Sequence, residues 1–515
     1  MKRAALLQQL QQHQRWDMII IGGGATGLGA AVEAASRGYK TLLLEGQDFA
    51  SGTSGRSTKL IHGGVRYLQQ GNIALVLDAL HERGLLIRNA PHLVQNRSFI
   101  VPLYDWWEGP FYGIGLKLYD ALAGKLGLGP SQLLSRAETL EQLPTLEEQG
   151  LHGGVIYHDG QFDDARLAIA LARTAVEQGA TVINHLPVTA LIKERGQVLG
   201  VIAHDGESGQ EYELAAKVVI NATGPFCDTI RRLDDPTAPT LLAPSQGIHL
   251  VLPRAFLPGA SAIMVPHTDD GRVLFAVPWH ERVLLGTTDT PVDRVDFEPR
   301  PLAAEIDFLL QHAARYLRHN PQRQDILSIF AGLRPLVKNG NSHDTASLSR
   351  DHTLLVTPSG LVTITGGKWT TYRKMGEETI NLAARIAVLP ERPSRSADLP
   401  LHGAGNEGSG EWSGYGSDAV GLEALCHADP SLRKLLHPDL PYRRVEIVWA
   451  IRHEWAQSVE DLLSRRTRAL ILDARAAIAV APAVAALLAA ELGKDAAWQA
   501  GELAAFTTLA QGYLP

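Results

Sequence analysis

Cysteine is scarce in this chain: among 515 residues only Cys227 and Cys426 occur, and they lie far apart. Two isolated cysteines support neither a disulfide framework nor a cysteine-based zinc site. Such usage is typical of a reducing cytoplasm, so we expect a cytoplasmic protein that holds no metal.

An excess of positive charge is also lacking. The formal net charge is −7, and the sequence contains no run of basic residues. Such a chain has no general electrostatic attraction for the phosphates of nucleic acid. We therefore expect no nucleic-acid partner.

Long apolar runs are absent as well. The most apolar segment, Ala476–Ala490, is interrupted by Pro482 and falls short of the roughly 20 residues that span a bilayer. The N-terminal stretch Met1–Arg15 lacks the apolar core of a signal peptide and predicts a short amphipathic helix. We expect no transmembrane helix.

The strongest pattern that is present runs from Trp16 to Glu45. An apolar strand is followed by a glycine-rich turn, a helix of small residues and a second strand that ends in an acid. This order is typical of a dinucleotide-binding unit. An ordinary glycine turn is the alternative, but it leaves the flanking strands and the terminal acid unexplained. The pieces are Asp17–Ile21, Gly22–Gly27, Leu28–Arg37 and Thr41–Glu45.

Each glycine of this turn has a separate expected role. Gly22 permits the tight turn, Gly24 lets the backbone approach a pyrophosphate, and Gly27 lets the helix pack closely on the strand. Glu45 lies roughly 20 residues beyond the glycines, where an acid accepts hydrogen bonds from a ribose. The predicted dinucleotide contacts are Gly22, Gly24, Ala25, Thr26, Gly27 and Glu45.

Later segments predict further strands. Val218–Gly224 and Leu361–Lys368 are apolar runs that return to the same parallel sheet, and a helix follows over Thr370–Ala387. The ends of both strands are expected to lie at the carboxyl edge of the parallel sheet, where ligands of such folds bind. The alternating segments Gly271–Trp279 and Arg282–Asp289 predict an antiparallel sheet in a second, substrate-facing domain.

The C-terminal part has a different pattern. Gly403–Ser417 is rich in glycine and serine and predicts a linker, and Leu422–Leu514 shows helical periodicity. We therefore predict an α/β protein with a discontinuous Rossmann-type nucleotide-binding domain, an antiparallel-sheet substrate (cap) domain and a C-terminal all-helical domain.

Four motifs are more specific than the glycine-rich unit, namely Ser57–Leu68, Gly332–Leu336, Ser349–His352 and Gly366–Arg373, and a C-terminal motif, Leu472–Ala477, accompanies them. Together they resemble the FAD-dependent glycerol-3-phosphate dehydrogenases of the aerobic, membrane-associated type, within the D-amino-acid-oxidase-like flavoprotein superfamily. The resemblance extends from about Asp17 to the C-terminal helices and implies FAD as the cofactor. No EF-hand spacing follows the helical domain, so we expect no calcium control.

The resemblance also implies domain limits and cofactor contacts. The FAD-binding domain takes residues 1–75, 150–230 and 335–395, and the substrate domain takes 76–149 and 231–334. A linker over 396–417 leads to the helical domain over 418–515. Further implied cofactor contacts are Thr53, Ser54, Ser57, Lys59, Leu60, His62, Gly63, Gly64, Val188, Ala222, Thr223, Gly224, Gly366, Gly367, Lys368, Trp369 and Thr370.

The substrate site is implied in the same way. Arg334 and Arg350 are the expected phosphate binders, because a planar guanidinium holds two phosphate oxygens at once. Arg66, Tyr67 and Lys368 are expected nearer the reacting end. Backbone N–H groups of the Gly366–Gly367 turn, with Lys368, would stabilise negative charge on the flavin; a surface turn with a solvated lysine is the alternative.

A proton acceptor completes the predicted site. His62 is the first candidate, because histidine works as a base near neutrality, and His249 is the second, also as a substrate-binding residue. A packed histidine that is hydrogen-bonded to flavin or backbone is the alternative for His62. The predicted catalytic residues are His62, Arg66, Tyr67, Arg334 and Lys368.

The predicted reaction is oxidation of sn-glycerol 3-phosphate to dihydroxyacetone phosphate by hydride transfer to FAD, with electrons passed to a membrane quinone. A glycerophosphate oxidase that makes hydrogen peroxide, and an amine or 2-hydroxy-acid oxidase on the same scaffold, are alternative enzymes. A flavin-binding regulatory or scaffold protein is the non-enzymatic alternative.

The segment Tyr104–Tyr119 concentrates aromatic residues near Lys117 and Lys125. This combination suits a helix that lies in a bilayer interface, and it equally suits a buried layer of the substrate domain. We expect peripheral association with the inner face of the cytoplasmic membrane, and the resemblance allows a homodimer.

Overall fold

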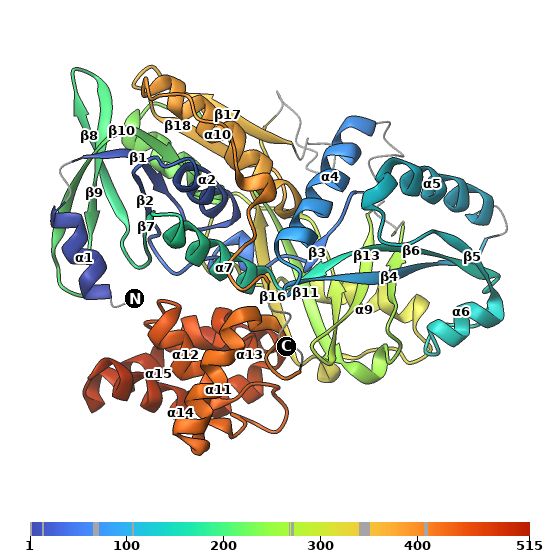
Figure 1. Cartoon of the computed structure of the whole chain (residues 1–515). Coiled ribbons are helices and arrows are strands. Elements are labelled where there is room, and N and C mark those ends of the chain that lie inside the picture. Colours follow the sequence, from blue (N-terminus) through green and yellow to red (C-terminus); the bar gives the residue numbers. More distant parts are fainter. Residues whose placement is uncertain are drawn as a thin grey trace.

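Two β-sheets lie side by side, and the C-terminal helices pack below them in the view of Figure 1. The computed structural model describes residues 3–12, 15–64, 72–105, 108–266, 268, 272–338, 351–405 and 410–515. The N-terminal helix α1 (Arg3–Gln12) buries Leu6 and Leu10, so the predicted short amphipathic helix is confirmed.

The first sheet is built on β1 (Trp16–Ile21), which is buried over Met18–Ile21. Such a run suits a central strand of a parallel sheet that helices cover. Helix α2 (Ala25–Ser36) packs on β1 and also on α7 and α10. The strand order is β17 (His352–Val356), β18 (Val362–Gly366), β10 (Glu211–Asn221), β1, β2 (Thr41–Leu44) and β7 (Thr181–Ile183), with β8 (Val188–Glu194) and β9 (Gln197–His204) extending from β10; the helices are α7 (Asp164–Glu177), α8 (Cys227–Asp234) and α10 (Tyr372–Ile386).

The carboxyl ends of the parallel strands meet at one edge of this sheet. Ile21 of β1 pairs with Leu44 of β2 and with Asn221 of β10, and Asn221 pairs with Thr363 of β18. The prediction that two later strands return to the sheet of the glycine-rich unit is therefore confirmed. Ligands of such sheets bind beyond this edge.

The second sheet has helices on both faces, as β4 (Val94–Leu103) illustrates. Phe99 and Val101 belong to a core shared with α5 (Glu108–Ala123), whereas Ile100 belongs to a core shared with α9 (Ala303–Tyr316). Successive side chains of a strand point to opposite faces, so both faces are apolar. The remaining elements are β3 (Leu60–Ile61), β5 (Gln132–Ser135), β6 (Gly153–Phe162), β11 (Ser245–Pro253), β12 (Ala262–Val265), β13 (Leu274–Trp279), β14 (Arg282–Gly286), β15 (Thr290–Pro291), β16 (Ser328–Arg334), α4 (Ile73–Asn89) and α6 (Arg136–Gln142).

Strand pairing departs from the predicted domain limits in one place. The antiparallel pairing of β13 with β14 confirms the prediction from the alternating segments Gly271–Trp279 and Arg282–Asp289. However, β6 and β3, which the predicted limits assign to the FAD-binding domain, belong to the second sheet: β6 pairs with the whole of β4, and β3 pairs with β6. Pairing between distant segments leaves no local signal, which explains the difference. The other domain limits stay a prediction.

The C-terminal all-helical domain is confirmed. Its helix α14 (Ala474–Leu492) runs through Pro482, so the predicted interruption is wrong: Pro482 is exposed, and packing against neighbouring helices offsets the lost hydrogen bond. By length and composition α14 could cross a membrane, but its inner face forms the core of this domain. The other helices are α11 (Ala419–Ala428), α12 (Arg444–His453), α13 (Ala469–Leu472) and α15 (Ala496–Gln511).

The predicted linker is packed where the structure describes it. Trp412 and Tyr415 are buried in a small core with Leu422 and Trp449. His402 is hydrogen-bonded to carboxylates on both sides, from α7 and from Asp418. Residues 410–417 therefore belong to the packing of the helical domain.

Candidate active site

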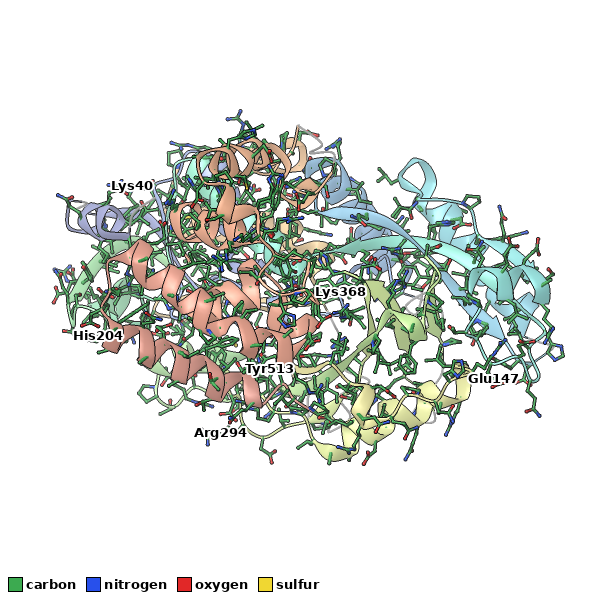
Figure 2. All side chains as sticks on the ribbon, turned by 90° about the horizontal axis from the view of Figure 1, so that it is seen from below. Lys40, Glu147, His204, Arg294, Lys368 and Tyr513 are labelled. Atoms are coloured by element: carbon green, nitrogen blue, oxygen red, sulfur yellow. The ribbon has the colours of Figure 1, made fainter. Side chains whose placement is uncertain are left out.

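A cavity of about 550 Å³ lies at the carboxyl edge of the first sheet, and the second sheet closes its other side. Figure 2 places Lys368 near the middle of the molecule, whereas Lys40, Glu147, His204 and Arg294 lie at its periphery. The predicted site residues that line this cavity are Gly22, Gly24, Ala25, Thr26, Glu45, Thr53, Ser54, Ser57, Leu60, His62, Val188, Ala222, Thr223, Gly224, His249, Arg334, Gly366, Gly367, Lys368, Trp369 and Thr370.

The glycine-rich turn leaves no room for side chains. Gly22 has a φ of 112°, and a Cβ atom there would lie 2.6 Å from the carbonyl oxygen of Ala222. A Cβ atom at Gly27 would collide with the carbonyl oxygen of Gly22, which agrees with close packing of helix on strand. Glu45 accepts a hydrogen bond from the Gly23 N–H at 2.6 Å. The bare backbone, the start of α2 and this carboxylate fit the pyrophosphate and ribose of FAD.

Four predicted cofactor contacts are not among the lining residues: Gly27, Lys59, Gly63 and Gly64. Lys59 is fully buried behind the wall, where its ammonium donates to the Gly55 carbonyl and, at 2.6 Å, to Asp164. Burial, partly opposed by Asp164 and reinforced by Arg468, lowers the pKa of Lys59 to about 7. Lys59 thus supports the wall, because its side chain points away from the cavity.

Arg334, the last residue of β16, donates to four hydrogen-bond acceptors among the residues that the structure describes. Nη1 donates to the Gln246 carbonyl (3.2 Å) and to Asp289 (3.3 Å). Nη2 donates to Thr287 Oγ1 (3.0 Å) and to the Thr288 carbonyl (2.8 Å). These contacts fix the plane of a half-buried guanidinium, and so its charge and geometry are set before a ligand arrives.

His249 lies in β11, beside this guanidinium. Its Nε2 is 2.9 Å from the Thr58 hydroxyl, its ring stacks on Phe330 at 4.8 Å, and its buried Nδ1 has no hydrogen-bond partner among the described residues. Burial, followed by the charges of Lys59 and Arg334, holds the pKa of His249 well below its usual range. The imidazole is therefore neutral at physiological pH.

A turn of two glycines closes the cavity at the start of α10. Gly366 and Gly367 both have positive φ, and a Cβ atom on Gly366 would lie 2.8 Å from the Asp351 carbonyl oxygen. Lys368 follows, and its ammonium nitrogen is shielded from solvent. The predicted arrangement of a glycine turn beside a lysine is thus present at the cavity wall, and the surface-turn alternative does not describe it.

Three predicted site residues, Arg66, Tyr67 and Arg350, lie outside the described residues. Sequence reasoning also missed several lining or supporting groups. Asp289 and Thr287 hold Arg334, and Thr58 holds His249. The signal for Thr287 and Asp289 was the run of polar residues directly after the apolar strand β14. Phe226 and Phe297 stack at 4.0 Å across the cavity wall and left no signal.

Among the described residues, one cluster has the composition of a metal site: Asp48, His185 and Asp461. Arg466 donates to both carboxylate oxygens of Asp48, and Arg465 donates to Asp461 at 2.8 Å. These guanidinium groups already neutralise the carboxylates, so the cluster is explained as an ion-pair network.

Comparison with known proteins agrees with this geometry. The chain matches the family described as FAD dependent oxidoreductase over residues 17–373, and the C-terminal domain of alpha-glycerophosphate oxidase over residues 412–499. The mitochondrial glycerol-3-phosphate dehydrogenase of Homo sapiens is 40% identical over 535 residues, which cover 96% of this chain and 73% of that protein. The probable mitochondrial enzyme of Caenorhabditis elegans is 41% identical, with 97% and 74% covered.

Solved structures give the same result. The glycerol-3-phosphate dehydrogenase from Bacillus halodurans complexed with FAD is 28% identical, with a TM-score of 0.81 over 100% of this chain and 98% of that chain. The L-alpha-glycerophosphate oxidase from Mycoplasma pneumoniae, at 19% identity and a TM-score of 0.58 over 74% of this chain and 97% of that chain, shares the fold. The chain therefore belongs to the FAD-dependent glycerol-3-phosphate dehydrogenases, within the family of FAD-dependent oxidoreductases.

Proposed function

We propose that the chain oxidises sn-glycerol 3-phosphate to dihydroxyacetone phosphate and passes the electrons to a membrane quinone at the inner face of the cytoplasmic membrane. The observation that carries the proposal is the guanidinium of Arg334, fixed by four acceptors, in one cavity with His249, Lys368 and the glycine-rich turn. When bound, FAD supplies the hydride acceptor, and the protein supplies position and electrostatics.

In this proposal Arg334 binds the substrate phosphate. A phosphate dianion gains charge-assisted hydrogen bonds from a fixed guanidinium, whereas an uncharged polyol gains much less. Lys368 and the N–H groups at the start of α10 line the same cavity, where they stabilise negative charge that develops on the cofactor. Arg350, Arg66 and Tyr67 are further proposed substrate contacts.

The proton of the reacting hydroxyl passes to a histidine. His249 is a weak base, because burial, and after it the charges of Lys59 and Arg334, lower its pKa, so we assign it a hydrogen bond to the substrate. His62 also lines the cavity and remains the proposed proton acceptor.

A membrane surface is proposed for helices α4 and α5. On α5, Tyr112, Leu116 and Tyr119 are buried, whereas Ile114 and Leu118 are exposed by 72% and 48% of their surface. The neighbouring helix α4 likewise exposes two aliphatic side chains, Ile73 and Leu77. The inner face of α5 is buried, as one predicted interpretation has it, and we propose the other interpretation, a bilayer interface, for the outer face. Trp106 and Trp107 lie outside the described residues.

The same helix contacts a segment next to the active cavity. The hydroxyl of Tyr119 accepts a hydrogen bond from the Gly63 N–H at 2.8 Å and donates one to Asp159 at 2.8 Å. Gly63 follows His62, which lines the cavity. A bilayer that holds the outer face of α5 would therefore bring a lipid-dissolved quinone close to the flavin, which supports the quinone as electron acceptor.

The proposal is tested by mixing the FAD-loaded protein, without oxygen, with glycerol 3-phosphate, glycerol, amino acids and 2-hydroxy acids. We expect rapid loss of the flavin absorbance with glycerol 3-phosphate alone and recovery on addition of a soluble quinone. Rapid recovery in air with one equivalent of hydrogen peroxide, and none with quinone, would instead identify an oxidase. Bleaching by an amino acid would overturn the substrate assignment.

A further inference from the structure

A second cavity, of about 390 Å³, lies where the second sheet meets the helical domain; we name it the junction cavity. Its lining includes His92, Arg97 and Trp279 on the sheet side, and Tyr442 and Arg468 on the helical side. It shares no lining residue with the active cavity. Its volume is in the range of sites for small molecules, roughly 300–1,000 Å³.

Two guanidinium groups of the junction cavity have no carboxylate partner among the described residues. Arg97 donates to the Gln161 side-chain oxygen at 2.7 and 2.9 Å and to the Ala260 carbonyl at 3.0 Å. Arg254 donates to the carbonyls of Leu257 and Gly259. Burial, and next the charge of Arg254, lower the pKa of Arg97. Two like charges thus stand close together, without a counter-charge from the described part of the chain.

Most carboxylates that line the cavity already have partners. Asp163 lies within 3.6 Å of Arg468 and 3.5 Å of His280, and Glu411 pairs with Arg443. Burial, opposed by hydrogen bonds from the Arg443 N–H and the Tyr415 hydroxyl, raises the pKa of Glu446 to about 7. The remaining carboxylate, that of the exposed Glu281, is on the turn between β13 and β14.

Two buried polar atoms of the lining lack hydrogen-bond partners among the described residues. One is Nε of Arg468, a side chain that is 1% exposed. The other is Nδ1 of His92, whose pKa is lowered to about 4 by burial and then by the charge of Arg166. A neutral imidazole offers one nitrogen as an acceptor, so His92 can receive a hydrogen bond from a hydroxyl group. Buried polar atoms without partners are uncommon and point to a missing ligand or water.

We propose that the junction cavity binds a small phosphate monoester that carries a hydroxyl group. Its dianion matches the two guanidinium charges of Arg97 and Arg254, for which the described part of the chain offers no carboxylate partner, whereas a carboxylate ligand would balance only one of them. Its hydroxyl would satisfy His92, and a phosphate or ester oxygen would satisfy Arg468.

The ligand would act on the active cavity through a shared wall. Arg468 of the junction cavity donates to Asp164 at 2.8 Å, and Asp164 accepts from Lys59, which supports the active wall, at 2.6 Å. Phe162, which lines the junction cavity, packs edge-to-face on Trp369, which lines the active cavity, at 5.5 Å. Occupation of the junction cavity is therefore expected to change the flavin absorbance without entering the active site.

The test uses the FAD-loaded protein with Arg334→Gln, which weakens binding of anions in the active cavity. Calorimetric titration with glycerol 2-phosphate is expected to show one site, weaker for inorganic phosphate and undetectable for acetate. Adding Arg254→Gln should weaken binding about tenfold or more, the usual effect of losing one charge-assisted contact. His92→Phe should remove the preference for glycerol 2-phosphate over inorganic phosphate.

The exposed Arg294, paired on the surface with Asp296, provides the matched control: Arg294→Gln should leave the affinity unchanged. No heat of binding in the Arg334→Gln protein, equal affinity with and without Arg254→Gln, or equal binding of acetate would each overturn the proposal. Circular dichroism and flavin content establish that each variant is folded. A flavin difference spectrum gives a second readout of binding that does not depend on turnover.

Discussion

Gly247 leaves the space that the guanidinium of Arg334 fills: a Cβ atom on residue 247 would lie 2.6 Å from Thr287 Oγ1 and still closer to Arg334 Nη2. The guanidinium of Arg334, which we propose to bind phosphate, and the backbone of β11 therefore leave no space for an additional methyl group between them. Gly247, Arg334 and Phe297 all line the active cavity.

Gly247→Ala should displace Arg334 and raise KM for glycerol 3-phosphate about tenfold or more, with less effect on flavin content, because the added methyl collides with the guanidinium. Steady-state kinetics and the ratio of flavin to protein absorbance measure both. Gly501→Ala is the matched control, since its Cβ would meet nothing within 4 Å. An unchanged KM in Gly247→Ala would show that Arg334 does not bind the substrate from this position.

Arg334→Ala should raise KM for glycerol 3-phosphate by about 10- to 100-fold, because charge-assisted hydrogen bonds to the phosphate are lost. FAD binding should change far less, because the glycine-rich turn and Glu45 are at the edge of the first sheet, whereas Arg334 is on β16 of the second sheet. Equal loss of substrate and cofactor binding would instead make Arg334 a structural residue.

Phe297→Ala should speed the release of FAD, because its ring stacks on Phe226 at 4.0 Å along the cavity wall. Stacked aromatic pairs contribute about 0.5–1.5 kcal/mol, so the expected change in release rate is about three- to tenfold. Release is followed by the rise of flavin fluorescence after dilution. Leu302→Ala, at another exposed apolar position, should leave the rate unchanged.

Ile114→Ser with Leu118→Ser should weaken binding to liposomes of anionic lipid, because the exposed apolar face of α5 is lost while its buried face is kept. Co-sedimentation measures the bound fraction, and solution activity with a soluble acceptor reports on folding. The matched control is Val388→Ser, an exposed aliphatic residue next to α10. Undiminished binding in the double variant would contradict the membrane surface.

The free energy of unfolding should fall as pH rises from about 6.5 to 9, because of His402. Burial lowers its pKa, but hydrogen bonds to Asp418 and Glu177 outweigh burial and raise the pKa to about 9. A group whose pKa is higher in the folded state than in the unfolded state contributes fully to the free energy of unfolding below its unfolded-state pKa. This contribution is lost as the pH rises through its folded-state pKa. His402→Asn should remove this part of the fall in urea unfolding curves, and an unchanged pH profile would contradict the assignment.

Much of the nucleotide-binding half was predictable because its contacts are local. The turn of Gly22–Gly27 and the acid Glu45 lie in one unit of about 30 residues, where glycine spacing and strand periodicity carry the geometry. The placement of Arg334 and Lys368 in one cavity was predictable only through the resemblance of whole motifs. The burial of the Lys59 side chain behind the cavity wall had no such signal.

By itself the sequence determined the dinucleotide unit, the helical C-terminal domain and the family, since these depend on short-range spacing and on motifs that are contiguous in the chain. The tertiary structure alone decided that β6 belongs to the second sheet, that Asp289 accepts a hydrogen bond from Arg334, and that Arg97 and Arg254 line the same junction cavity. The physical reason is that the register of the strands and the contact between domains determine which side chains lie next to each other. A shift of one residue in the pairing register turns every side chain of a strand to the other face.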